Sequence, residues 1–109
     1  MLLDELARTS AAVAGTSSRL AKVDALAALL RRLRPEEVPI AVAYLAGSLP
    51  HDPVRVGWAS LREQPPPAPS ATLELLEVDA TLRRIGEAAG AGSQARRRGL
   101  LDGLLARAT

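Results

Sequence analysis

Apolar residues recur at helical spacing along most of the chain, and this pattern predicts an all-α fold of about five to six helices. The stretches 2–14 and 18–33 are the clearest, because each repeats apolar residues at intervals of three and four. In the second stretch these residues form one stripe, made of Leu20, Val23, Ala27 and Leu30 and widened by Leu26 and Leu33. We expect that stripe to face the core.

Turn and cap residues predict where the first helices begin and end. Gly15 ends the first helix, and one of three polar residues caps the second: Thr16, Ser17 or Ser18. Glu36, Glu37 and Pro39 suit the first turn of a third helix, which then runs to Ala46. Because its residues from Ile40 onward are apolar on every side, we expect this helix to be central and buried.

The middle of the chain is rich in proline and glycine. Residues 48–57 are expected to form a loop, and 57–63 a short helix that carries Trp58 and Leu61. A proline-rich connector follows at about 64–70, which is either a stiff spacer between helical layers or a ligand for a partner domain.

Beyond the connector the pattern predicts two further helices. Residues 73–78 read as a short extended lead-in, and Asp79 is expected to cap a helix over 80–89 with Leu82, Ile85 and Ala89 facing inward. The last helix is expected over 94–107, and it would bury Leu100, Leu101, Leu104 and Leu105. Those apolar faces need more cover than the last residues give, so we expect the 109 residues to be the front part of a larger helical domain.

Composition supports helices, and the charge distribution separates the two ends of the chain. There are 19 Leu and 21 Ala, but one Trp, one Tyr and no Phe. Residues 1–79 carry eight basic and ten acidic residues, a net charge of −2, whereas residues 80–109 carry six basic and two acidic residues, a net charge of +4. Such asymmetry suggests a face for nucleic acid or another anionic surface near the C-terminus.

Several functional classes are disfavoured by composition. No Cys is present, so thiolate metal sites and cysteine nucleophiles are excluded. One histidine and scattered carboxylates argue against a dedicated metal site, and no P-loop occurs. No signal peptide is visible, and no apolar run approaches the roughly 20 residues that span a membrane, so a cytoplasmic protein without a membrane partner is expected.

Two short motifs resemble catalytic sites only superficially. His51 and Asp52 are adjacent in a loop, where neighbouring side chains rarely face each other productively. Lys22-Val23-Asp24-Ala25 resembles the Lys-x-Asp-Gly motif of nucleotidyl transfer, but Ala25 replaces the glycine and the stretch lies inside the best-patterned helix. We therefore predict no catalytic residue.

A glycine-rich turn that leads into arginines is the strongest candidate site. The turn ends at Ser93, an expected N-cap, and three consecutive arginines follow in the first turns of the helix. Helix N-termini attract phosphates, and guanidinium groups add to that attraction. The pattern predicts a phosphate-contact site formed by Gly90, Gly92, Ser93, Gln94, Arg96 and Arg97. The same residues also fit an ordinary capped helix with a solvated arginine face.

A set of short segments stands in a definite order along the chain. They are Thr16–Leu20 with Lys22, Val38–Leu45 with Gly47, Leu49-Pro50, Val54–Ala59 with Leu61, Pro65–Pro67, Val78-Asp79 with Thr81-Leu82, Gly90–Arg96 and Leu104–Thr109. In this order, and over nearly the whole chain, they resemble the N-terminal helical DNA-binding domain of bacterial, actinobacterial-type ATP-dependent DNA ligases.

The resemblance implies a domain that grips nicked duplex DNA through backbone contacts, without reading a base sequence. It implies ATP and Mg for the full-length ligase, and roles in DNA replication, repair and recombination. The adenylation and OB-fold domains of the family are absent, so we expect a monomeric fragment that binds no cofactor and is inactive alone. The alternative is a helical protein-interaction module that binds no nucleic acid.

Overall fold

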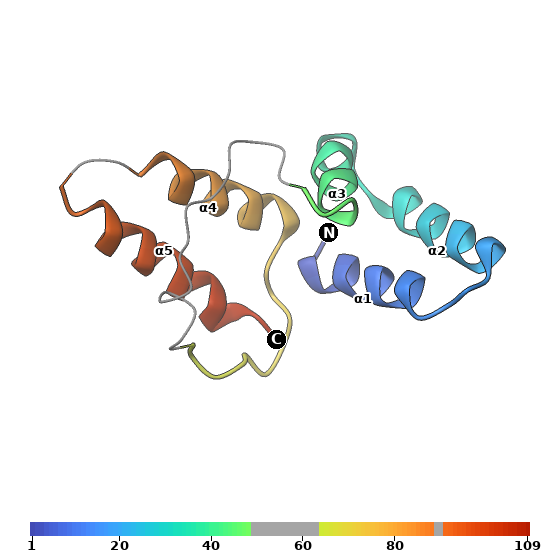
Figure 1. Ribbon diagram of the computed structural model, residues 1–109, viewed down its shortest axis with the longest axis horizontal. Coiled ribbons are helices and arrows are strands. Elements are labelled where there is room, and N and C mark those ends of the chain that lie inside the picture. The colour runs from blue at the N-terminus through green and yellow to red at the C-terminus, as the bar shows by residue number, and fades with distance from the viewer. Residues whose placement is uncertain (49–63, 89–90) are drawn as a thin grey trace.

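The computed structural model describes residues 1–48, 64–88 and 91–109, and these residues form an all-α fold, as the sequence predicts (Figure 1). Its elements in chain order are α1 (Leu3–Ala14), α2 (Arg19–Arg32), the 3-10 turn η1 (Pro35–Glu37), α3 (Val38–Leu45), α4 (Leu75–Glu87) and α5 (Ser93–Arg107). Within these ranges the only β pairing is an isolated bridge between Leu2 and Glu74. No described helix is both long and apolar enough to cross a membrane.

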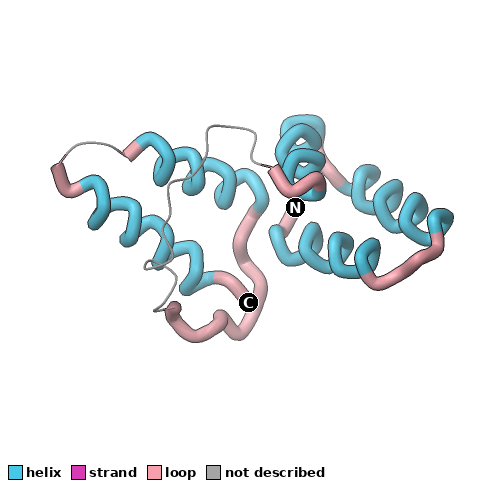
Figure 2. Tube along the Cα trace, viewed as in Figure 1, coloured by secondary structure: helices cyan, strands magenta, loops and turns pink. Residues whose placement is uncertain are grey.

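The described helices gather at two ends of an elongated molecule of 50 × 27 × 23 Å. α1 and α2 run antiparallel at one end, with α3 beside them, and α4 and α5 run antiparallel at the other end (Figures 1 and 2). Residues 64–70, the predicted connector, contain no helix or strand. The expected short helix over 57–63 and the His51–Asp52 pair lie outside the described residues.

The start of the chain joins the two ends of the molecule. The Leu3 amide donates to the Leu73 carbonyl at 2.8 Å, and the Leu75 amide donates to the Met1 carbonyl at the same distance. Nearby, the Tyr44 hydroxyl of α3 donates to Oδ1 of Asp79 on α4 at 2.9 Å. These bonds hold the lead-in to α4 against α1 and α3.

A cluster of charges beside this junction centres on the buried carboxylate of Glu37. The Met1 ammonium donates to Glu37 at 2.5 Å and to Glu74 at 3.1 Å. The backbone amide of Arg34 donates to the second Glu37 oxygen at 2.8 Å. The Met1 ammonium, and after it the Arg34 amide, lowers the pKa of Glu37 to about 2. Glu37 raises the pKa of the Met1 ammonium in turn.

The buried apolar side chains form a core at each end. Leu6, Leu29, Ala41 and Leu75 join α1, α2, α3 and the start of α4. Val78, Ile85 and Leu101 are buried where α4 and α5 pack together. Of the four leucines expected to be buried on α5, only Leu101 is fully so; the other three are partly exposed.

The apolar stripe predicted for α2 is only partly buried: Leu26, Ala27 and Leu33 are partly buried, but the other three members are exposed. Leu20 is 72% exposed, Val23 53% and Leu30 43%, whereas Leu29 is fully buried. Apolar residues occur on nearly the whole circumference of α2, so the sequence pattern does not show which face is buried. Contact with α1 selects the Leu29 side. The predicted cap is confirmed, because the Ser18 hydroxyl oxygen accepts from the Ala21 amide at 3.2 Å.

The third and fourth helices also differ from the prediction. α3 is not buried all round: Ala41 is its one fully buried residue among those described, and Val42 is 49% exposed. α4 begins at Leu75 in place of residue 80, so Asp79 lies inside the helix and does not cap it. Leu75, Val78 and Ile85 share one helical face, and burying them against α3 and α5 stabilises the longer helix.

Candidate nucleic-acid interface

The turn before α5 has a left-handed backbone at Gly92. Gly92 is the N-cap with φ at +78°, a conformation that strains any residue with a Cβ. Ser93 is the first helical residue, so the expectation that it is the N-cap is wrong, and no side chain caps this end. The Arg96 amide makes the first helical bond, to the Gly92 carbonyl at 3.1 Å. The first amides of α5 are therefore without helical acceptors.

The predicted site residues do not all face the same way. Ser93 is partly buried, Gln94 is exposed in the first turn, and Gly90 lies outside the described residues. Nη2 of Arg97 donates to the carbonyl of Ala88, the C-cap residue of α4. A cation at the carboxyl end of a helix is favourable, so Arg97 ties the start of α5 to the end of α4.

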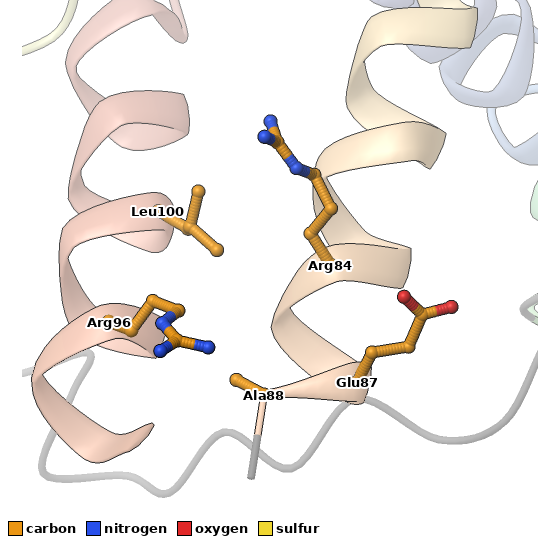
Figure 3. A pocket seen from close by; sticks show the side chains of 5 residues that line it. All are labelled: Arg84, Glu87, Ala88, Arg96 and Leu100. Atoms are coloured by element: carbon orange, nitrogen blue, oxygen red, sulfur yellow. The ribbon is translucent and has the colours of Figure 1, made fainter. Parts of the chain in front are cut away.

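Arg96 faces a cleft between α4 and α5 of about 460 Å³. The cleft is lined by Arg84, Glu87 and Ala88 from the α4 side and by Arg96 and Leu100 from α5. Figure 3 shows the Arg84 and Arg96 guanidinium groups directed into the space between the helices, whereas the Glu87 carboxylate points away from α5. Arg84 is a candidate that the sequence analysis did not single out.

Apart from Arg97, the other arginines of these two helices have acidic neighbours. Arg83 lies 3.9 Å from Asp79, and Arg98 lies 4.0 Å from Asp102, one helical turn away in each case. Arg107 pairs with Glu77 and thereby lowers the pKa of the Glu77 carboxyl. It also donates to the Thr72 carbonyl. Neither Arg84 nor Arg96 forms a hydrogen bond or ion pair through its side chain with any other residue that the structure describes. Two exposed, uncompensated cations therefore face one cleft.

Arg84 could have been found only with knowledge of how α4 and α5 pair. It lies 12 positions before Arg96 in the sequence, and only the antiparallel turn brings the two together. By contrast, Lys22 of the imperfect Lys-x-Asp-Gly motif lies within α2, as the sequence predicts, and its side chain is partly buried.

Comparison with known proteins identifies DNA ligases as relatives along the whole chain. The chain is 51% identical over 111 aligned residues to a probable DNA ligase of Mycobacterium bovis and to DNA ligase B of Mycobacterium tuberculosis. A probable DNA ligase of Streptomyces griseus is 50% identical over 109 residues. In each case all of this chain is covered, but it spans only 21–22% of the relative's length. No family model and no solved structure matches the chain.

Proposed function

The chain belongs to the actinobacterial-type DNA ligases, of which it spans about a fifth, and we propose that its role there is to hold duplex DNA around a nick. The observation that carries this proposal is the pair of uncompensated arginines, Arg84 and Arg96, beside the start of α5. Guanidinium groups and exposed helix amides bind phosphate oxygens, which are present at every position of a duplex. A ligase segment of this kind binds without reading a base sequence.

The charge distribution supports the same surface. Residues 80–109 carry the chain's basic excess of +4, and they form the larger part of the α4–α5 end. Binding through phosphate contacts releases counterions, so it weakens steeply as salt rises. In this proposal the contacts come from Gly90, Gly92, Ser93, Gln94, Arg96 and Arg97, the residues singled out in the sequence.

The experiment is a titration of labelled nicked duplex with the 109-residue chain, followed by fluorescence anisotropy at several salt concentrations. We expect Arg96→Ala/Arg97→Ala to weaken binding at least about tenfold and to lower the slope of log affinity against log salt, because phosphate contacts are lost. Two duplexes of unrelated sequence should give the same affinity.

The matched control is Arg19→Ala/Arg31→Ala, which removes the same charge from α2 at the other end of the molecule. It should bind DNA nearly as well as the unsubstituted chain. Circular dichroism establishes that both double variants stay helical, which matters because Arg97 also bonds to α4. Unchanged binding in Arg96→Ala/Arg97→Ala would show that the proposed site is wrong.

Further parts of the proposal concern the protein to which this segment belongs. We propose a cytoplasmic, ATP- and Mg-dependent ligase that seals nicks in DNA replication, repair and recombination. The segment contributes binding as a monomer, and the chemistry takes place elsewhere. Its single lysine lies in Lys22-Val23-Asp24-Ala25, which lacks the glycine of the nucleotidyl-transfer motif. We therefore expect no adenylation and no sealing by this chain alone.

A second candidate function is a helical protein-interaction module. It is supported by exposed apolar side chains on α2 and α3, among them Leu20 at 72% and Val42 at 49%. An apolar hollow between α1, α2 and α3 is lined by Val13, Leu26, Leu30, Val42 and Leu45. That function predicts protein binding at the α1–α3 end and no retardation of DNA at low salt.

A further inference from the structure

The cleft between α4 and α5 is lined by two cations, one from each helix, with Leu100 between them in the view of Figure 3. Arg84 comes from the last turns of α4 and Arg96 from the first turns of α5, and both guanidinium groups point into the same space (Figure 3). Neither guanidinium group has an acidic partner among the described residues, so an anion bound in the cleft could interact favourably with both. The arrangement is therefore one that an anion stabilises.

The surroundings of the two arginines favour a fixed anion site over a diffuse basic surface. Ala88 and Leu100 contribute an apolar lining, which strengthens electrostatic attraction relative to open water. The Arg97 bond to the Ala88 carbonyl links the adjoining helix ends, so the two arginines are presented from elements that are held together. Glu87 also lines the cleft, but its carboxylate points away from α5.

We propose that Arg84 and Arg96 together clamp a single backbone phosphate of duplex DNA. Guanidinium groups form paired hydrogen bonds with phosphate oxygens, and two of them on opposite sides can bind the two non-bridging oxygens of one phosphodiester. This inference rests on the proposed function for its choice of ligand. It adds Arg84 to the binding residues and assigns it the same phosphate as Arg96.

The test is a double-mutant cycle on the 109-residue chain, measured by anisotropy with nicked duplex across a range of salt. Arg84→Ala and Arg96→Ala should each weaken binding about tenfold, and each should reduce the salt slope by about 0.9, the value for one phosphate contact. Because both residues hold the same phosphate, the double variant should lose far less than about a hundredfold, with no further change in slope.

The control variants distinguish the effect of the guanidinium's forked donors from the effect of positive charge alone. Arg83→Ala removes the neighbouring charge, which pairs with Asp79, and should weaken binding at most about twofold. Arg84→Lys keeps the charge but not the forked donors, so its affinity should lie between those of Arg84→Ala and the unsubstituted chain. Arg84 is exposed, and thermal unfolding should show unchanged stability in these variants.

Two results would overturn the clamp while leaving the proposed function intact. In the first, the chain binds DNA but Arg84→Ala behaves like Arg83→Ala. In the second, the losses in the double variant multiply and the salt slope falls by about 1.8, as two separate phosphates require.

A second measurement distinguishes failure of the clamp from failure of the proposed function. Inorganic phosphate is titrated into isotope-labelled chain while the side-chain Nε–Hε signals of the arginines are followed by NMR. Saturable shifts at Arg84 and Arg96, with none at Arg83, show that the two arginines bind phosphate; if the chain then binds no duplex, the proposed function and the assignment of the phosphate to DNA are wrong. No shift together with no duplex binding overturns both.

Discussion

Three consecutive arginines at the start of α5 have three different environments. Neighbouring residues on a helix point about 100° apart, so a run of like residues cannot share one surface. Arg96 faces the cleft, Arg97 bonds to the Ala88 carbonyl of α4, and Arg98 lies 4.0 Å from Asp102. The sequence could indicate that this region is basic, but it could not show which arginine is available to a ligand.

Glu37 provides a prediction about stability at the scale of one residue. Its carboxylate is 1% exposed and accepts from the Met1 ammonium and the Arg34 amide. Glu37→Gln leaves the buried ammonium with only the exposed Glu74 as a charged partner, and losing the buried partner should cost about 3 kcal/mol. Urea unfolding at neutral pH, monitored by circular dichroism, should show this loss. Glu36→Gln, at an exposed neighbouring position, is the control and should change stability little.

The Glu37 carboxylate also makes the stability of the folded chain depend on pH. The pKa of Glu37 is about 2 in the folded chain and 4.5 when unperturbed, so the unfolded state takes up the proton first. The stabilisation is therefore complete above about pH 4.5 and is lost as the pH falls toward 2. Urea midpoints measured over this window should fall more steeply for the unsubstituted chain than for Glu37→Gln. Parallel curves would show that Glu37 is not the group responsible.

At the scale of helices, the sequence predicts that a helix forms better than it predicts where the helix begins or which of its faces is buried. α1 and α2 begin and end within about two residues of the expected positions, since glycine and serine caps define them locally. The buried face of α2 and the start of α4 depend on partners far away in the chain, on α1 for Leu29 and on α3 for Asp79. Local patterns carry no information about such partners, which is also why Arg84 was missed.

Two leucines of α2 test this account of its buried face. Leu29→Ala removes a fully buried side chain and should destabilise the chain by about 3 kcal/mol, through lost burial and the cavity left behind. Leu20→Ala makes the same chemical change at a position that is 72% exposed, and should cost less than about 0.5 kcal/mol. Thermal or urea unfolding of both variants gives the comparison. Equal losses would mean that the sequence-predicted stripe is buried after all.

At the scale of the whole molecule, the arginine-lined cleft and the exposed large apolar side chains lie at opposite ends. Arg84 and Arg96, which line the cleft, belong to α4 and α5, whereas the exposed Leu20, Val23 and Val42 belong to α2 and α3 (Figure 1). In a molecule 50 Å long, these ends are separated by much more than the screening length of about 8 Å at physiological salt. A ligand bound at one end therefore has little direct electrostatic effect on the other.

This separation allows one footprint to decide between the two candidate functions. Hydrogen exchange of backbone amides is measured with and without nicked duplex at low salt. DNA binding predicts slower exchange in the first turn of α5 and the end of α4, with α1 and α2 unchanged, because only contacted or stabilised segments gain protection. The Arg84→Ala/Arg96→Ala chain serves as the control and should lose most of this protection. Protection confined to α2 and α3 would show that DNA binds at the other end of the molecule, and no protection anywhere would contradict DNA binding and favour the protein-interaction module.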